Sequence, residues 1–360
     1  MGDGSGEVAL FTVPRIRYSS AVTIPGAGIS AANQTASRIE RYLDIVAPKL
    51  LQVEEELRKK FDSDVLTIRE VGDHVLEGGG KRLRPMLVLL VSDMLGYEGS
   101  RDITFAAVIE FIHTATLVHD DIIDEAAVRR GKTSVNYRWG NHLTVLIGDF
   151  LYAHAMDIGL EDGGVDVLRL LSKVTIRMTE GEILGLERNG RADLTLDDYF
   201  DIVERKTAAL FAASCRIGAL LTKESEDVGR RLWDYGLNLG ICFQLVDDLL
   251  DFTSSTEVLG KPVLADLKEG KLTLPLILAL PQATPEERQM IERVLSEKTF
   301  GDLDPTDIVS IANRYGSIDE TRVIAREYAD RAREAISIFP SSRSLEALEW
   351  AVDFVLSRDR

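Results

Sequence analysis

Two stretches of the chain each place three aspartates at the same spacing among apolar residues. One is Thr116–Asp124 (TLVHDDIID) and the other is Phe243–Asp251 (FQLVDDLLD). On a helix, the first and third aspartates of each triplet project from the same face, one turn apart. The two triplets are Asp120, Asp121 and Asp124, and Asp247, Asp248 and Asp251.

Carboxylates that crowd a buried face need cations, because they otherwise repel one another and lose their hydration. A single motif of this kind, in so acidic a chain, could be a solvated acidic stripe. The second copy favours a metal site, because chance duplication in a matching apolar context is improbable. Mg²⁺ suits such a site, since it usually combines one or two carboxylates with substrate phosphate oxygens. We therefore expect two facing helices that bind a diphosphate through Mg²⁺.

Further polar residues extend both acidic faces. His113 lies seven residues before Asp120, and Gln244 lies three before Asp247, so each falls on the face of its own aspartates. Either residue alone could be a hydrogen-bonded side chain of the core. Their alignment with the aspartates favours a place in the site.

A lysine interrupts a third apolar stripe, in the helix expected after Thr195. Lys206 stands where the spacing of residues 196–221 calls for a core residue, and Thr207 lies beside it. Because a lysine is rarely fully buried unless it is paired, Lys206 either reaches the edge of the bundle or meets an anion inside it. In a chain expected to hold a diphosphate, we favour the anion.

Basic residues gather in three further segments, and none of these is a GxxxxGK[ST] phosphate loop. Each could be surface charge. A site that binds one diphosphate through metal, and another directly through basic side chains, accounts for all three. The last segment, residues 260–271, could also close as a lid over the second acidic helix. The candidate substrate contacts are Lys81 and Arg84 in GGGKRLRP, Arg129 and Arg130 after the first motif, and Lys261 and Lys271 at the ends of the last segment.

The elements that position these groups are expected to be helices. From Ala36 onward, apolar residues recur every three or four positions with few alternating runs, which predicts an all-α fold. Thr195–Asp198 and Thr284–Glu287 have the pattern of capping boxes at helix starts. Residues 36–360 contain no linker and form one predicted domain. The first 35 residues, with five Gly and two Pro, predict a mobile tail.

Charge and cysteine content restrict the partners. The 59 acidic and 42 basic residues give a net charge of −17, which disfavours nucleic acid. Cys215 and Cys242 lie in apolar segments without a CxxC pair, so we expect reduced core cysteines and a cytoplasmic protein. No apolar stretch approaches the ~20 residues of a membrane span.

Together, these motifs resemble the trans-isoprenyl diphosphate synthase family, over roughly residues 40–355. The matching segments occur in the family's order: GGGKRLRP, HTATLVHDDIIDEAAVRRG, ERKTAALF, FQLVDDLLDF and EGKLTLP. The resemblance implies a single helical bundle around a central cavity, a homodimer, and three Mg²⁺ ions per site. One departure is Leu264–Ala265, where many members have a glycine; this leaves the lid geometry and the role of Asp266 open.

The resemblance also assigns roles to the motif residues. Mg²⁺ is bound by Asp120, Asp124 and Asp247, with Asp121, Asp248 and Asp251 in support. Isopentenyl diphosphate is bound by Lys81, Arg84, His113 and Arg130, and the allylic diphosphate by Arg129, Lys206 and Lys261.

The implied chemistry is ionisation followed by condensation. Mg²⁺ and basic side chains neutralise the departing diphosphate, which lowers the barrier to breaking the allylic carbon–oxygen bond. The Thr207 hydroxyl, the Gln244 carbonyl and helix carbonyls then stabilise the allylic cation that the isopentenyl double bond attacks. In the family the diphosphate takes the released proton, so no general base is expected.

Two alternatives come from other classes. A class I terpene cyclase has an NDxxSxxxE-like second motif, which DDLLD does not match. A non-catalytic subunit of a heteromeric synthase is expected to have lost aspartates from one motif, and both are complete here. An active elongating synthase is the favoured interpretation.

Product length is expected to depend on the helix face that precedes Asp120, because each turn of ~5.4 Å is comparable with one isoprene unit. Farnesyl-forming relatives carry aromatic rings four or five residues before this aspartate, where this chain has small ones. The aliphatic residues further down could line a tunnel reaching ~18 Å, which predicts about seven to ten isoprene units, as in quinone side chains. The alternative is a geranylgeranyl product capped by an aromatic ring. The residues concerned are Ala115, Thr116, Ile112 and Val108 for the tunnel, and Phe111 for the cap.

Overall fold

The structure is a computed structural model that describes residues 29–129, 131–162, 164–253 and 263–358. Two predicted site residues, Arg130 and Lys261, lie outside the described residues. The chain divides into two compact units, Met1–Arg41 with Arg360, and Tyr42–Asp359. In the first unit, residues 29–41 are helical, although residues 29–35 were expected to belong to the tail. The second unit contains every described site residue.

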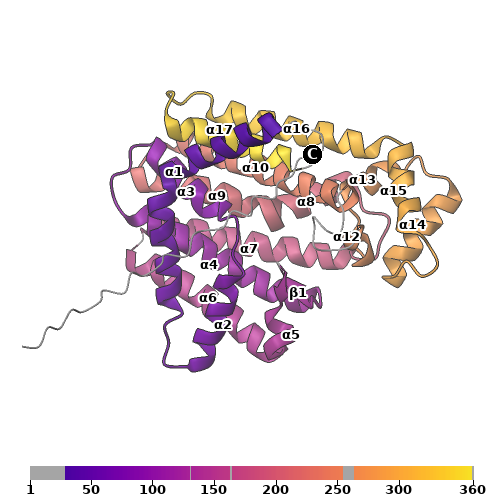
Figure 1. The fold of residues 1–360 in the computed structure, drawn as a ribbon, viewed down its shortest axis with the longest axis horizontal. Helices are drawn as coiled ribbons and strands as arrows, with labels where there is room; N and C mark the ends of the chain where they lie inside the picture. Colours follow the sequence, from indigo (N-terminus) through magenta and orange to yellow (C-terminus); the bar gives the residue numbers. More distant parts are fainter. Residues whose placement is uncertain (1–28, 130, 163, 254–262, 359–360) are drawn as a thin grey trace, which may run out of the picture. The chain divides into compact units, whose positions relative to one another are not determined.

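The described residues form helices with one two-stranded antiparallel hairpin, so the all-α prediction is confirmed (Figure 1). The elements are α1 (Ile29–Lys60), α2 (Leu66–Glu77), α3 (Leu83–Met94), α4 (Arg101–Ile123), β1 (Val128–Arg129), β2 (Lys132–Thr133), α5 (Val135–Trp139), α6 (Asn141–Asp162), α7 (Val165–Arg188), α8 (Leu196–Val203), the π-helix η1 (Glu204–Ala208), α9 (Ala209–Thr222), α10 (Glu226–Thr253), α12 (Ala265–Lys268), α13 (Leu274–Ala279), α14 (Pro285–Glu297), α15 (Pro305–Arg314), α16 (Ser317–Ile336) and α17 (Arg343–Ser357).

Both predicted capping boxes start helices. The Thr195 hydroxyl accepts a hydrogen bond from the Asp198 amide (3.1 Å) at the start of α8. The Thr284 hydroxyl accepts one from the Glu287 amide (3.2 Å) at the start of α14, where Pro285 is the first helical residue. These local signals satisfy amides that have no partner inside the helix.

The helix expected over residues 196–221 is interrupted. It runs as α8, then as one π-helical turn over Glu204–Ala208, and then as α9. A π turn holds one more residue than an α turn, and such turns occur mostly at functional sites. The apolar spacing continues on both sides of the turn, so the sequence pattern does not reveal it. Lys206 and Thr207 are both in this turn.

Two glycines bring the site helices close together. A Cβ on Gly240 of α10 would lie 2.6 Å from the Ala208 Cα, and a Cβ on Gly181 of α7 would lie 2.7 Å from the Lys206 amide nitrogen. Only glycine allows backbones to approach this closely. The π-helix η1 is therefore packed tightly against both α7 and α10.

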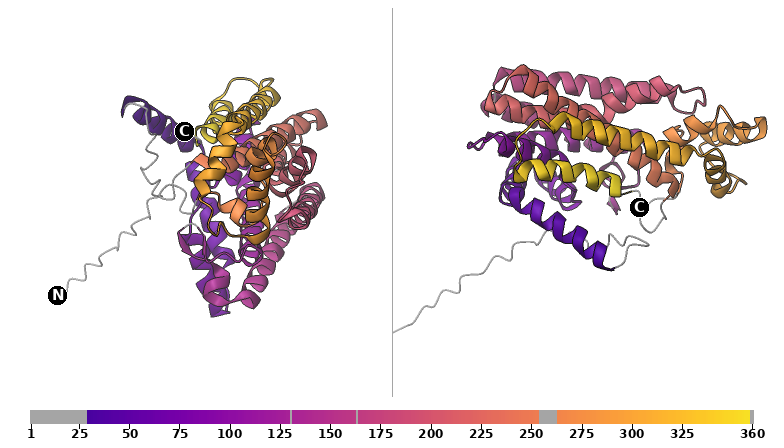
Figure 2. Two further views of the ribbon diagram at one scale, coloured as in Figure 1. Left: turned by 90° about the vertical axis from the view of Figure 1, so that its right-hand side faces the viewer. Right: turned by 90° about the horizontal axis from the view of Figure 1, so that it is seen from above.

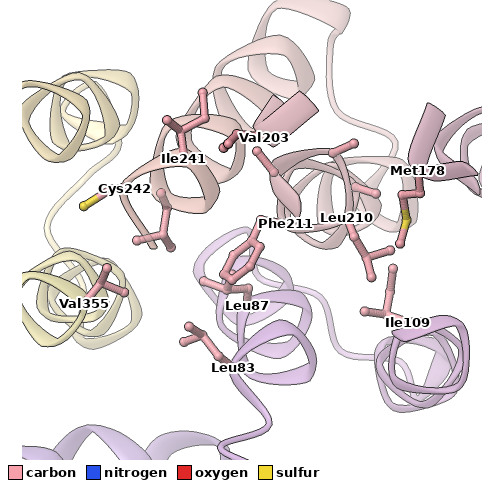
Figure 3. Close-up of a cluster of buried hydrophobic side chains, with 14 of the residues drawn as sticks. Leu83, Leu87, Ile109, Met178, Val203, Leu210, Phe211, Ile241, Cys242 and Val355 are labelled. Atoms are coloured by element: carbon pink, nitrogen blue, oxygen red, sulfur yellow. The ribbon is translucent and has the colours of Figure 1, made fainter. Parts of the chain in front are cut away.

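The core of the second unit lies where α3, α4, α7, α9, α10 and α17 meet. Figure 3 shows Leu87 of α3, Ile109 of α4, Phe211 of α9 and Val355 of α17 among these buried side chains. Helix α10 packs against α9 and α16, and α16 and α17 lie side by side in both views of Figure 2. This packing carries the two acidic motifs on α4 and α10.

Helix α6 has an apolar surface. Among the described residues, Asn141–Glu161 is the one segment long and apolar enough by composition to cross a membrane, and 39% of that window is buried. The same helix packs against α4 and α7. The expectation that no apolar stretch approaches this length is wrong for this segment, although core helices of soluble proteins pass the same test.

Candidate active site

The first acidic motif occupies the last turn of α4, which ends at Ile123 with Asp124 as its C-cap. The C-terminus of a helix carries partial negative charge, so carboxylates here are unfavourable without a cation. Asp120 is half-buried, and its carboxylate has no hydrogen-bond or ion-pair partner among the described residues. Burial raises the pKa of Asp120 to about 6, against the opposing charge of Lys206. This carboxylate is therefore suited to a bound cation.

The other two aspartates of the first motif are paired. Asp121 is buried and forms an ion pair with Arg129 of the β1–β2 hairpin. Asp121 also lines a pocket together with Arg129, Lys132 and other residues. Asp124 accepts a hydrogen bond from the Lys271 ammonium at 2.9 Å.

The second acidic motif gives its three aspartates different surroundings. The Asp247 side chain is 44% exposed and lies 3.2 Å from the Arg358 guanidinium. Asp248 and Asp251 are buried. Both carboxylate oxygens of Asp251 accept backbone amides, those of Ala265 and Asp266. Of these three aspartates, Asp247 is the one that is open to solvent.

A hydrogen-bonded network links η1 to the second motif. The Thr207 hydroxyl donates to the Gln244 carbonyl (3.0 Å), and the Gln244 amide donates to Asp248 (2.9 Å). The Tyr199 hydroxyl donates to the other Asp248 oxygen at 2.5 Å. Burial, with Asp266 nearby, raises the pKa of Asp248 to about 7. The network fixes the orientation of Thr207 and Gln244.

Lys206 meets a carboxylate supplied by the protein. Its ammonium forms an ion pair with Glu182 of α7, whose side chain is 18% exposed. The sequence analysis favoured an anion beside Lys206 but did not name Glu182. Because the Lys206 charge also acts on Asp120, the lysine lies between α7 and the first motif.

The basic residues of GGGKRLRP lie in and after the connection from α2 to α3. The Arg84 guanidinium lies 3.2 Å from His113 Nε2 and 4.3 Å from the centroid of the Phe211 ring. Lys81 lies 5.4 Å from the centroid of the Phe354 ring. Desolvation and the nearby Arg358 charge lower the pKa of Lys81 to about 8, while Asp247 opposes the shift. Two of the predicted contacts of isopentenyl diphosphate, Arg84 and His113, are thus brought together.

Four site residues were missed by the sequence analysis. Arg358, just after α17, stacks 4.7 Å from the Phe243 ring centroid as well as pairing with Asp247. Arg82 adopts the left-handed conformation (φ +47°) and pairs with Glu54 and Glu110 in the interior. Arg82 lies in GGGKRLRP, between the two basic residues that the sequence analysis named, so its charged side chain was visible in that motif. The others come from distant segments: they are Arg358, Glu182 and Tyr199.

The carboxylates fit Mg²⁺ but do not form a complete cage. In the described part of the chain, no three side chains of His, Cys, Asp or Glu gather closely enough to hold a metal on their own. Five of the six predicted carboxylates are engaged with protein donors or cations, and Asp120 is the exception among the described residues. Mg²⁺ needs only one or two carboxylates from the protein, because water and substrate phosphate oxygens complete its coordination shell. The candidates for such ligands are Asp120, which has no partner among the described residues, the exposed Asp247, and Asp124 once Lys271 releases it.

The residues expected to limit product length lie inside α4. Ala115, Ile112, Phe111 and Val108 are buried, and Thr116 is half-buried with its hydroxyl donating to the His113 carbonyl (2.8 Å). The Phe111 ring packs against Phe61, with centroids 6.1 Å apart. Thr116 thus satisfies its hydroxyl within its own helix.

Known proteins match this chain over most of its length. The family model described as polyprenyl synthetase matches residues 65–310. The chain belongs to the polyprenyl synthetase family. This confirms the resemblance to trans-isoprenyl diphosphate synthases and makes the chain a prenyltransferase.

Relatives and solved structures agree with this family. The octaprenyl diphosphate synthase of Escherichia coli (strain K12) is 39% identical over 323 residues, covering 89% of this chain and 99% of that protein. Solanesyl-diphosphate synthase 2, chloroplastic, of Oryza sativa subsp. japonica is 35% identical over 94% of this chain and 86% of its own. A polyprenyl synthase from Caulobacter crescentus CB15, complexed with calcium and isoprenyl diphosphate, has a TM-score of 0.84 at 36% identity, covering 89% of this chain and 98% of that chain.

Proposed function

We propose that this prenyltransferase condenses isopentenyl diphosphate head-to-tail with allylic diphosphates and makes an all-trans product of about seven to ten isoprene units. The observation that carries the length is the pair of small residues, Ala115 and Thr116, before the first acidic motif. The names of the octaprenyl and solanesyl relatives support the same range. Phe111, the residue that could cap a geranylgeranyl product, packs against Phe61, which favours the longer product.

Asp120, Asp124 and Asp247 are the proposed Mg²⁺ ligands. The metal would supply positive charge to the departing diphosphate. Asp248 and Asp251 are assigned here to positioning, because their carboxylates are buried and engaged with protein donors. A ligand set of few carboxylates leaves positions for water and substrate oxygens, as Mg²⁺ requires.

Binding exchanges the partners of the basic residues. Arg129, Lys206 and Lys271 are each paired with a carboxylate of the protein. The allylic diphosphate offers these cations a more highly charged anion, while the metal offers a cation to Asp124. Neutralisation of the leaving group then favours loss of the diphosphate. Before binding, Lys271 is charged, because Asp124 and Glu269 raise its pKa although burial opposes the shift.

The allylic cation requires stabilisation without a nucleophile. The Thr207 hydroxyl and the Gln244 carbonyl are hydrogen-bonded to each other beside η1, and their oxygens carry partial negative charge. Asp248 holds the Gln244 amide and so determines which end of the side chain faces Thr207. Oriented dipoles of this kind stabilise charge without moving during the reaction.

A homodimer is the proposed assembly, and α6 and α7 are its proposed interface. Large apolar side chains on these two helices are exposed, which marks a protein-binding surface. They are Val145, Leu146, Leu160, Val165, Ile176, Ile183 and Leu186. An active species that sediments at monomer mass excludes this assembly. The buried free thiols of Cys215 and Cys242 support the proposed cytoplasmic location.

The purified protein, isopentenyl diphosphate, an allylic diphosphate and Mg²⁺ test the proposed reaction. Chromatography and mass spectrometry of the dephosphorylated products should give linear prenyl alcohols, and chelation of the metal should stop their formation. A cyclic hydrocarbon, or no elongation with any allylic primer, contradicts the proposal.

A further inference from the structure

Asp251, the last aspartate of the second motif, clamps the segment at residues 264–266. Its Oδ1 accepts the Ala265 amide at 3.1 Å and its Oδ2 accepts the Asp266 amide at 3.2 Å. Its backbone carbonyl accepts the Leu264 amide at 2.9 Å. Three successive amides, at the start of α12, are thus bound by one residue. Such amides have no partner within their own helix.

The clamp closes on a strained residue. Leu264 has φ +56° and ψ +37°, the left-handed conformation, which is strained for a residue other than glycine. Its side chain is fully buried. Strain of this kind persists only where the surroundings determine the backbone. Many members of the family have a glycine in this part of the segment, but here the turn relies on the buried leucine and on Asp251.

The clamped turn continues directly to a basic residue of the site. The Lys271 amide donates to the Asp266 carbonyl (2.8 Å), and the Lys271 ammonium reaches Asp124 of the first motif (2.9 Å). A second attachment holds the same segment, since the Gly190 amide donates to the Gly270 carbonyl (2.8 Å). The position of Lys271 thus depends on anchors at both ends of the segment, Asp251 at one and Gly190 at the other.

We propose that Asp251 is a positioning residue, which places Lys271 for the allylic diphosphate by holding residues 264–266, and that it is not a metal ligand. The role of Lys271 rests on the proposed function; the clamp itself does not. A carboxylate is needed because two amides must be accepted at once. An asparagine accepts one of them and turns an N–H toward the other.

Hydrogen exchange in the absence of metal and substrate tests the clamp. In Asp251→Asn, peptides covering residues 264–271 should exchange at least about tenfold faster than in the wild type, because their local opening is easier. Asp247→Asn is the matched control, and exchange in the same peptides should be unchanged. Circular dichroism should report the same helix content in both variants.

Kinetics separate positioning from metal binding. Asp251→Asn should raise the KM for the allylic diphosphate by about tenfold and leave the Mg²⁺ concentration for half-maximal activity within about twofold of wild type. Asp247→Asn should raise that Mg²⁺ concentration. An Mg²⁺ requirement raised equally in both variants, or unchanged exchange in Asp251→Asn, overturns the proposal.

The wild-type protein provides a check if Asp251→Asn does not fold. The amides of Ala265 and Asp266 should be protected without Mg²⁺, and addition of Mg²⁺ alone should leave their exchange unchanged. Fast exchange that becomes slow only with the metal contradicts the clamp. These measurements use no prenyl substrate, so their outcome is independent of whether the wild type makes a polyprenyl product.

Discussion

Lys271 and Asp124 lie 2.9 Å apart, and this pair joins the segment that follows the second acidic motif to the end of the first. The two residues are separated by 147 positions in the chain. In the proposed function, the diphosphate binds the lysine and Mg²⁺ binds the aspartate. Binding of metal and substrate would then break this ion pair.

Removal of the Asp120 charge should affect activity and stability in opposite directions. Asp120→Asn should lower kcat by about 100-fold or more, because it removes a proposed metal ligand. In the metal-free protein the same change should be neutral or slightly stabilising, since it removes an unpaired carboxylate at a helix C-terminus. Steady-state kinetics and thermal unfolding without metal measure the two effects. A large loss of stability indicates instead that Asp120 has a structural role.

Arg84 should act on isopentenyl diphosphate. Arg84→Ala should raise the KM for this substrate by about 10- to 100-fold, and the KM for the allylic diphosphate much less, because it removes a charged hydrogen-bond donor from one of the two anion sites. Arg230→Ala is a matched control, since Arg230 is an exposed arginine that pairs with Asp227. Equal effects on both substrates contradict the assignment.

The alkaline limb of the pH profile should report Lys81. Desolvation lowers the pKa of this lysine to about 8, so its charge is lost as pH rises through that value and is fully present well below it. In the free enzyme, kcat/KM for isopentenyl diphosphate should therefore fall above about pH 8. Lys81→Arg keeps the charge at higher pH and should move this limb upward. An unchanged limb in Lys81→Arg assigns it to another group.

Glu110 should be needed for stability. It is buried and shares the Arg82 guanidinium with Glu54. Glu110→Ala leaves a buried arginine one partner short, and this should lower the free energy of unfolding by about 3 kcal/mol. Glu56→Ala, which removes an exposed partner of Lys59, should cost less than about 0.5 kcal/mol. Urea denaturation distinguishes the two. Equal stabilities contradict a structural role for the Arg82 ion pairs.

Local patterns in the sequence predict the helices and the chemistry of the motifs. The capping boxes at Thr195 and Thr284 form because they involve residues three positions apart. Both acidic motifs lie on helices as expected, since apolar spacing marks the buried face. Lys206 pairs with a carboxylate of the protein, Glu182, and its expected contact with the diphosphate stays a prediction.

Contacts between distant segments are not visible in such patterns. The sequence places Asp251 with the metal ligands, because spacing fixes the face of a residue and not its partner. Its partners come from a separate turn at Ala265 and Asp266. Arg358 reaches Asp247 across 111 positions of the chain. The π-helix η1 leaves the apolar spacing intact, so the sequence pattern does not predict it either.

The central claim is that the product grows along the face of α4 that includes Ala115, and the length distribution of the products tests it most directly. With a short allylic primer, isopentenyl diphosphate and Mg²⁺, the wild type should give products of about seven to ten isoprene units, and Ala115→Tyr should give markedly shorter ones. Thr114→Tyr adds the same ring to the neighbouring face of α4, where Thr114 lines a pocket that does not include Ala115, and should leave the length unchanged. Wild-type products that stop at four isoprene units, or an Ala115→Tyr distribution identical to that of the wild type, would contradict the account.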